Sequence, residues 1–466
     1  MLLTLTFTVM IGDYVEAMIL PAIPVIQKDF NTTPTLVAWT TSILLVVGTA
    51  LVPVFSKLGD IRGKKKMLVI SLGIYTIGVG VAWLAPTIYV LLFARAIQAT
   101  GVVLAPLALA IVTDIFPKEK QALGQSVLGG AVAISTTSGY VLGSVVIQSV
   151  GWRDGFLTVL CASVLALVLA EIVLVEGPVA RGSAIDYSGA FMLGAGVLFV
   201  LAYLTEGSSI GWSSLEDISL LLPGLGLLAV FPFFENRRTN PLIELRLLRI
   251  RNFFVSNTVR FLGGICNFLF YYPFVYFAEY PKPYGLGLGI ESTGFILAPA
   301  TLSVLGWALL YGKLIPKVGP RPVMLVGSGA LIAGLALCIL QRSSPVYFAL
   351  DAIIFFSGLV PVLFSSVNMA SLSLPKDQVT IGMGVNSMLG TLGQSFGPII
   401  ATTILVSYTE PLTKVVNGQT VVVGQIASPM AFSLIFGVGI VITCLVILAS
   451  FFGRNYTFSK SESTSS

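Results

Sequence analysis

The sequence has no histidine, four cysteines and few charged residues. Because imidazole is absent, histidine-based zinc sites and imidazole proton relays are excluded. The four cysteines lie at unpaired spacings within apolar runs, so we expect no disulfide framework. Only 10% of the 466 residues are charged, whereas soluble domains have about a quarter. The chain therefore lacks the polar surface that a water-soluble protein of this size needs.

Nucleotide-binding motifs are also missing. The stretch "GDIRGKKK" from Gly59 is not a phosphate loop, because too few residues separate its glycines and no Ser or Thr follows the lysine. The glycine-rich "GLGLG" from Gly285 has no predicted strand before it. We therefore expect no ATP hydrolysis, no resident metal and no cofactor. The formal net charge of +5 is spread over short loops, so nucleic-acid binding is not expected either.

Apolar runs of membrane-spanning length fill the chain instead. The sequence is 56% hydrophobic, and about 20 apolar residues suffice to cross a bilayer as a helix. The first run lacks the basic region and cleavage site of a removable signal peptide, so we count it as a span. Only helices satisfy every backbone group within such single segments, which predicts an all-α membrane protein with fourteen transmembrane helices. The predicted spans are Leu3–Pro24, Thr35–Phe55, Met67–Ala85, Ile88–Thr113, Leu123–Gln148, Phe156–Leu174, Tyr187–Leu204, Ile218–Phe234, Asn252–Phe277, Ile290–Tyr311, Pro322–Leu340, Val346–Ser366, Ile381–Val406 and Pro429–Phe452.

Basic residues are divided unequally between the two sides of the predicted membrane. The loops after even-numbered spans, together with the C-terminal tail, hold most lysines and arginines. The loops on the other side hold Lys28, Arg153, Lys282, Arg342 and Lys414. Because positive residues accumulate on the cytoplasmic side, we expect a multi-pass protein of the cell membrane with both termini in the cytoplasm.

The chain repeats itself at a wide interval. "SKLGDIRGKKKM" from Ser56 returns as "GKLIPKVGPRPV" from Gly312, which aligns Gly63 with Gly319. Two further matches, "RAI" with "DAI" and "FPKEKQALG" with "LPKDQVTIG", follow in the same order. Spans one to six thus correspond to spans nine to fourteen, with spans seven and eight inserted. Duplicated halves are typical of a transporter whose site lies between them near the bilayer midplane. We expect two pseudo-symmetric six-helix bundles, residues 1–176 and 252–466, joined by two inserted helices and a cytoplasmic loop in 177–251.

Two carboxylates interrupt the first span, "FTVMIGDYVEAMILPAIP". At about 1.5 Å per residue, Asp13 lies roughly 15 Å and Glu16 roughly 20 Å into a core about 30 Å thick. An ionised acid at that depth costs about 2.5–3.5 kcal/mol, so such residues normally face a cavity or a partner. We expect them to bind protons or substrate, with Glu16 as the first candidate and Asp13 as the second. The alternatives are a structural ion pair, or a span frayed enough to hydrate one acid.

Other polar and aromatic residues in the spans have two interpretations each. Arg95 is the natural counter-charge for the acids, or a structural arginine on backbone carbonyls. Its repeat counterpart Asp351 forms a second site, or simply reaches the outer interface. Arg260 is expected to extend its charged end to the membrane surface. The aromatic run "FLFYYPFVYF", Phe268–Phe277, could line a pocket, but an aromatic belt at the outer interface explains it more simply.

Several segments resemble the major facilitator superfamily. "SKLGDIRGKKKM" is similar to its loop signature between spans two and three, and "LLFARAIQATG" to its fourth-span motif. "VGWRDGF", "IDYSGAFMLGAGVLFVLAYLTEGSSIGW" and "FENRRTNPLIELRLLRIRNF" resemble the fourteen-span drug:proton antiporter branch. The resemblance implies the major facilitator fold and alternating access between inward- and outward-facing states.

The loop signature implies a cytoplasmic gate at Gly59, Asp60, Arg62 and Gly63. In the family, the matching aspartate latches the two halves, partly against a helix N-terminus in the other half. Here that helix would begin near Thr380. The two glycines are expected to permit a tight turn. The alternative is a loop that only sets topology, which explains the lysines but not the aspartate.

The fifth-span antiporter motif departs from the family pattern. The family has Gly-Pro followed by paired glycines, where this chain has Gly139, Tyr140 and, further on, a single Gly143. These changes weaken the antiporter interpretation more than the transporter interpretation.

Together these features predict a secondary transporter, not an enzyme. We expect a monomer in the lipid bilayer that exports amphiphilic or cationic small molecules in exchange for protons. The alternatives are a symporter or facilitator of small metabolites or organic anions, and a non-transporting receptor or scaffold.

Overall fold

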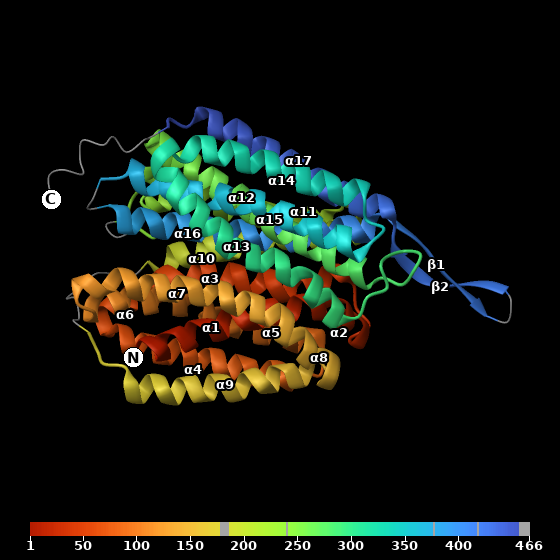
Figure 1. Ribbon diagram of the computed structural model, residues 1–466, viewed down its shortest axis with the longest axis horizontal. Coiled ribbons are helices and arrows are strands. Elements are labelled where there is room, and N and C mark those ends of the chain that lie inside the picture. The colour runs from red at the N-terminus through yellow and green to blue at the C-terminus, as the bar shows by residue number, and fades with distance from the viewer. Residues whose placement is uncertain (178–185, 239–240, 376–377, 417–418, 456–466) are drawn as a thin grey trace.

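The computed structural model of the protein describes residues 1–177, 186–238, 241–375, 378–416 and 419–455. They form an elongated bundle of lengthwise helices with both chain ends at one end and a β-hairpin at the other (Figure 1). In the described part, fourteen helical spans are long and apolar enough to cross a membrane, which confirms the predicted number. The side chains of Lys414 and Thr380, named above, lie outside the described residues.

The N-terminal half comprises the first six spans, drawn in red to yellow in Figure 1. Three of these spans are built from two helices each. A 3₁₀ turn containing Pro21 joins the first pair, a second 3₁₀ turn at Ala99–Val103 joins the next, and a π-helical turn at Gly139–Gly143 joins the third. The helices are α1 (Leu2–Ile19), α2 (Ile23–Asp29), α3 (Pro34–Arg62), α4 (Lys64–Trp83), α5 (Ile88–Gln98), α6 (Leu104–Ile115), α7 (Lys118–Ser138), α8 (Ser144–Val150) and α9 (Trp152–Val173).

The C-terminal half contains the last six spans. They are α12 (Arg251–Glu279), α13 (Ile290–Val318), α14 (Pro320–Leu340), α15 (Pro345–Ser373), α16 (Val379–Ser407) and α17 (Pro429–Phe452). The inserted helices α10 (Tyr187–Glu206) and α11 (Leu215–Glu235) lie between the halves in sequence. In space, α10 packs against both α3 and α16. Thr403 of α16 donates to the Leu204 carbonyl at 2.9 Å, so α10 bridges the two halves as well as joining them.

A two-stranded antiparallel hairpin projects from the bundle (Figure 1). Strand β1 (Thr409–Val416) pairs with β2 (Gln419–Ala427) between the last two spans. The predicted all-α membrane fold is confirmed for the spans, and this loop hairpin is an addition that the sequence did not predict. Threonine and valine are frequent in both strands, and these β-branched residues favour strands over helices.

The internal repeat appears in the backbone at two matching glycines. Gly63 has φ +104° between α3 and α4, and its partner Gly319 has φ +88° between α13 and α14. Glu176 accepts backbone hydrogen bonds of 2.9 and 3.0 Å in the first turn of α4. Asn455 accepts a 3.3 Å bond in the first turn of α14. Each capping residue lies three positions after the last helix of its half, so the duplication includes the helix caps.

The two halves are joined at the hairpin end of the bundle. Side-chain hydrogen bonds cross between the halves from mid-bundle to that end. Gly294 of α13 fits so closely against α7 and α8 that an added methyl would lie 2.2 Å from Ser144 Oγ. The bundle is therefore closed on the hairpin side. The crossing bonds join Ser42 to Ser395 (2.7 Å), Thr41 to Tyr272 (3.0 Å), Gln27 to Tyr276 (2.8 Å) and Thr137 to Thr301 (3.2 Å).

Candidate functional site

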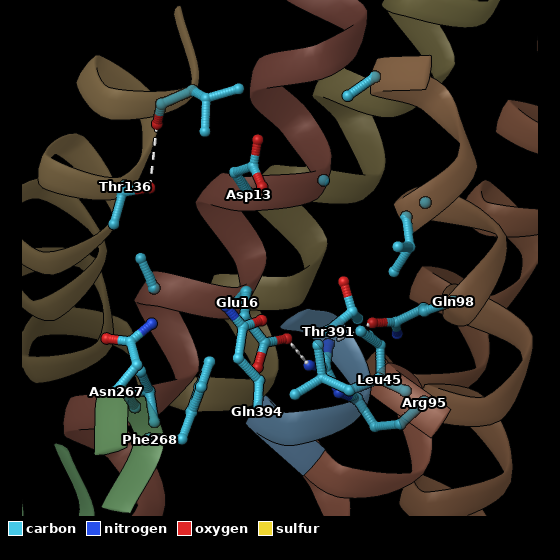
Figure 2. A pocket seen from close by; sticks show the side chains of 18 of the residues that line it. Asp13, Glu16, Leu45, Arg95, Gln98, Thr136, Asn267, Phe268, Thr391 and Gln394 are labelled. Atoms are coloured by element: carbon cyan, nitrogen blue, oxygen red, sulfur yellow. Dashed lines mark hydrogen bonds and ion pairs between the residues drawn. The ribbon is translucent and has the colours of Figure 1, made fainter. Parts of the chain in front are cut away.

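A cavity of about 370 Å³ lies between the halves, near the middle of the spans. Helices α1, α3, α4, α5, α6 and α7 contribute one wall, and α12 and α16 contribute the other. Figure 2 shows this site from close by. Three of the lining residues carry charge, Asp13, Glu16 and Arg95, and all belong to the N-terminal half. Of the four residues predicted for proton or substrate binding, the structure brings these three together.

Arg95 of α5 binds Glu16 of α1 (Figure 2). The arginine side chain is 0% exposed, and its Nη2 donates to Glu16 Oε2. Its Nε donates to the Thr40 carbonyl at 2.8 Å, and its Nη1 donates to Gln98 Oε1 at 2.7 Å. Arg95 therefore fits both interpretations from the sequence. It is a counter-charge for an acid, and it also donates a hydrogen bond to a backbone carbonyl. These contacts fix the guanidinium on the cavity wall.

Asp13 lies about one turn from Glu16 on the same helix and faces the cavity (Figure 2). Among the described residues, no hydrogen bond or ion pair joins it to a partner. Glu16 Oε1 is also buried without a partner. With both acids ionised, the three charged residues of the cavity have a net charge of −1. The site thus offers two acceptor positions to a cationic donor.

The C-terminal half supplies an uncharged wall of amide, hydroxyl and aromatic side chains. These residues are Asn267, Phe268, Tyr271, Thr391 and Gln394. The sequence analysis did not identify the amides, although amides in the middle of apolar spans were a usable signal. Such a wall can hydrogen-bond a substrate and stack on its rings without fixing its charge.

The aromatic run Phe268–Phe277 lies on this side and is buried. Phe270 stacks on Phe355 with ring centroids 3.9 Å apart, and Phe274 stacks on Phe348 at 4.1 Å. The interpretation as an outer aromatic belt is therefore wrong. Its physical reason is that α12 packs against α15, α16 and α17 in the interior, so its rings face other helices rather than the membrane surface.

Asp351 and Arg260 are not among the residues that line the cavity. Asp351 is fully buried, and its Oδ1 accepts a 3.1 Å hydrogen bond from Gln341 Nε2. Arg260 packs on α16 so closely that a methyl on Gly390 would lie 2.6 Å from its Nε. That Nε is buried without a partner among the described residues, whereas the residue as a whole is half-buried, so the extension of its charged end to the membrane surface stays a prediction.

The loop between α3 and α4 is held by its own half. Asp60 has a 52% exposed side chain and lies 3.4 Å from Lys64 Nζ, which also binds Asp114 of α6 at 2.6 Å. Among the described residues, no hydrogen bond or ion pair joins Asp60 to the C-terminal half. Arg62 is exposed at the end of α3. The latch thus stays a prediction, for a state in which the halves meet at this end.

The two glycines of this loop have different roles. Gly63 adopts a positive φ, and an added methyl would lie 2.5 Å from the carboxyl of Glu176. Gly59 is helical instead, and a methyl there would lie 3.0 Å from Leu107 of α6. The tight-turn prediction is therefore confirmed for Gly63 and wrong for Gly59, which permits close helix packing. Glu176 was missed because it lies over 100 residues away along the chain.

The antiporter-motif region forms the π-helical turn against α1. A methyl on Gly139 would lie 2.6 Å from Ala17 Cβ, and one on Gly143 would lie 2.6 Å from Met18 Cγ. The glycines therefore permit close contact with the helix that carries both acids. Tyr140, which replaces the family proline, lines the cavity.

Comparison with known protein families gives a match over most of the chain. The family described as Major Facilitator Superfamily matches residues 3–398. Multidrug resistance protein Stp of Mycobacterium tuberculosis is 25% identical over 391 residues, 83% of this chain and 72% of that protein. Multidrug resistance protein 3 of Bacillus subtilis is 26% identical, over 82% of this chain and 75% of its own. The tetracenomycin C resistance and export protein of Streptomyces glaucescens is 24% identical, over 82% of this chain and 71% of that protein.

Solved structures share the fold at lower identity. A bacterial homologue of the human lysosomal transporter Spinster, in an inward-facing and unoccupied conformation, is similar with a TM-score of 0.67. It is 14% identical and covers 97% of this chain and 95% of its own. A POT family transporter in complex with 5-aminolevulinic acid also has a TM-score of 0.67, at 15% identity, with coverage of 97% and 96%. At these identities the likeness concerns the fold alone.

Proposed function

The chain belongs to the major facilitator superfamily and is a multi-pass membrane transporter, not an enzyme, and from that premise we propose that it exports amphiphilic cations in exchange for protons. The observation that carries the proposal is the charge of the central cavity. Asp13 and Glu16 outweigh Arg95 by one negative charge, and among the described residues of the opposite wall no charged one lines the cavity. Several relatives are named as multidrug resistance or export proteins, which agrees with this direction of transport.

The size and lining of the cavity fit a drug-sized molecule. Small-molecule sites are usually about 300–1,000 Å³, mostly apolar and equipped with a few polar groups. The cavity of about 370 Å³ combines the rings of Phe268 and Tyr271 with three uncharged polar side chains on the same wall. An aromatic ring can stack on a flat apolar body or face a cation, and these contacts tolerate different shapes.

We assign the two acids different tasks. Arg95 stabilises the charged form of Glu16, so we assign Glu16, with its free Oε1, to the cationic group of the substrate. Asp13 has no such counter-charge and binds the proton. The sequence analysis placed Glu16 before Asp13 as the proton-binding acid. We reverse this order because Arg95 lies beside Glu16. Substrate and proton then compete because each neutralises the same excess negative charge.

Alternating access connects this competition with transport. The bonds at the hairpin end close one side of the cavity, so the substrate enters from the side of the termini. We place that side in the cytoplasm of a cell-membrane protein because the basic residues gather there. Asp60 would latch this side after the halves rock, against the N-terminus of α16. A single chain contains both walls of the site, which supports a monomer.

The alternative of organic-anion transport needs a free cation in the cavity. Arg95 is the one cationic residue that lines it in the described structure, each of its three nitrogens donates to Glu16, Gln98 or Thr40, and Glu16 balances its charge. The alternative of a non-transporting scaffold does not explain why Asp13 lies in the cavity without a partner among the described residues.

The function is tested by proton release from the purified protein. In weakly buffered detergent solution, tetraphenylphosphonium should release protons as it binds, and a pH indicator measures them. An organic anion of similar size is the control. Proton uptake with the anion and no response to tetraphenylphosphonium would favour the symport alternative, and no response to either would favour the scaffold.

A further inference from the structure

A second pair of acids lies outside the cavity, at the end of the bundle that holds the chain termini. There α10 begins and α11 ends. Asp186 precedes α10 as its N-cap and is 8% exposed. Glu235 is the last residue of α11 and is 1% exposed. Neither residue lines the central cavity. Acids at helix ends are usually hydrated, so the burial of both requires an explanation.

Each carboxyl uses one oxygen for a backbone hydrogen bond. Asp186 Oδ1 accepts from Gly189 N at 2.8 Å, which caps α10. Glu235 Oε1 accepts from Ile243 N at 2.6 Å, which holds the segment that follows α11. The other oxygens, Asp186 Oδ2 and Glu235 Oε2, are buried and have no hydrogen-bond partner among the described residues.

The two remaining oxygens converge above Gly189. A methyl group placed on Gly189 would lie 2.7 Å from Asp186 Oδ2 and 2.9 Å from Glu235 Oε2. The absence of a side chain at this position therefore makes room for both carboxyls in one place. Two ionised carboxylates can only accept hydrogen bonds, so neither could satisfy the other. One proton between them satisfies both oxygens and leaves a single negative charge.

The described surroundings offer no cation that could satisfy the two oxygens in place of a proton. On α3, which packs against α10, Lys57 has no hydrogen bond or ion pair with either acid. Among the basic residues after α11, Arg238 lies over the Phe234 ring at 4.3 Å, and Arg237, Arg246 and Arg249 are exposed and form no ion pair with either acid among the described residues. Glu244 is half-buried, and no hydrogen bond or ion pair among the described residues joins it to the pair. The cluster that holds the following segment takes Phe253 from α12, Ala370 from α15, Leu374 just after α15, and Val385 and Met388 from α16, and these residues supply no cation.

We propose that Asp186 and Glu235 form a second proton-binding site, in which one shared proton clamps segment 241–250 to the inserted helices. Ile243, bonded by Glu235, and Leu247 are buried in the apolar cluster with α12, α15 and α16. The clamp therefore connects the inserted helices to the C-terminal half. When an O–H bond of the pair breaks, the proton passes to water on that side and the pair carries two negative charges. The carboxylates then repel, and the bond to Ile243 loosens.

Infrared spectroscopy tests the shared proton directly. Glu235→Gln and Asp186→Asn each replace the shared O–H with an amide donor and keep one carboxylate. At neutral pH, the wild-type-minus-variant spectrum of either variant should show one lost neutral carboxyl band and no lost carboxylate band. A lost carboxylate band in both difference spectra would show that the wild-type pair is doubly ionised and would overturn the proposal.

Hydrogen exchange of segment 241–250 tests the clamp without any transport measurement. After correction for intrinsic exchange, release of one proton on opening should speed exchange by up to about tenfold per pH unit in the wild type. Glu235→Gln should remove this pH dependence, and Glu244→Gln, a nearby acid outside the pair, should keep it. A pH-independent wild type would contradict the clamp. Exchange that instead follows added Na⁺ or Ca²⁺ would identify a metal as the occupant and would also overturn it.

Discussion

Tyr140 of the N-terminal half stacks on Tyr271 of the C-terminal half, with ring centroids 5.5 Å apart and an interplanar angle of 26°. Both side chains are buried and both line the central cavity. The contact therefore joins the two halves at the substrate site itself. The residue that departs from the family's fifth-span motif is the one that makes this contact.

Removing this stack should weaken the closed hairpin end. An aromatic pair contributes about 0.5–1.5 kcal/mol beyond its buried area, which corresponds to roughly a two- to tenfold change in the ratio of states. Tyr140→Ala should therefore increase the population with separated hairpin ends, as measured by spin labels at the exposed Asn31 and Ser343. Tyr140→Phe keeps the ring and should behave like the parent. Equal distance distributions in all three proteins would exclude a gating role for the stack.

Proton coupling should depend on Asp13. Asp13→Asn keeps the shape and removes the titration, so it should abolish accumulation driven by a pH gradient while sparing substrate exchange. Glu16→Gln should weaken binding of a cationic substrate, because it removes the charge beside Arg95. The measurement is transport into proteoliposomes with and without the imposed gradient. The coupling proposal fails if both single variants and the double variant respond to the gradient like the parent.

The gate loop should act through Asp60 in the opposite state. Asp60→Asn should shift the ratio of inward- to outward-facing states, by about tenfold for a latch of 1.4 kcal/mol. Spin-label distances between Lys66 and Lys317, both exposed, report the opening at this end. Asp114→Asn is the matched control, since it removes the 2.6 Å partner of Lys64 within the N-terminal half. If both variants shift the distances alike, the loop acts only by stabilising its own half.

The orientation of the bundle can be tested by labelling. In a cysteine-free background, a cysteine at Val422 in the exposed hairpin should react with a membrane-impermeant maleimide added to intact cells. A cysteine at Lys66 should react only after the membrane is opened. The opposite pattern would place the termini outside and reverse the proposed direction of access.

The helix cap at Gly63 should matter for stability. Gly63→Ala forces an alanine to φ +104° and brings its methyl to 2.5 Å from the Glu176 carboxyl. Backbone strain of this kind costs about 1–3 kcal/mol, so the thermal unfolding temperature should fall. Gly312→Ala is the control, because nothing lies within 4 Å of an added methyl there. An unchanged unfolding temperature in both variants would mean that the loop relaxes around the methyl.

The number of spans could be predicted from the sequence because lipid requires long apolar helices. The position of the acids also predicted a polar site in the first span. The sequence could not predict which acid binds Arg95. Side chains three positions apart on a helix point in directions that differ by about 60°, and either acid could face the arginine. The choice depends on the rotation of α1 about its own axis relative to α5. A 3₁₀ turn containing Pro21 directly follows α1.

Long-range contacts escaped prediction for a different reason. Glu176 caps a helix that begins more than 100 residues earlier, and no local pattern marks that pairing. The aromatic run of α12 was misinterpreted because composition shows that rings are present but not whether they face lipid or neighbouring helices. Its stacking on Phe348 and Phe355 follows from the central place of α12 in its half.

The confinement of charge to one wall of the cavity has an electrical consequence. The Glu16–Arg95 pair has no net charge, so its movement through the membrane field does no net work. Charge changes at Asp13, which releases its proton when a monovalent cation binds beside Glu16. Such an exchange would respond to the pH gradient alone, at about 1.4 kcal/mol per pH unit. A neutral or divalent substrate would also respond to the voltage, at about 2.3 kcal/mol per 100 mV for each uncompensated charge. The valence of the substrate would thus decide which component of the proton-motive force drives its export.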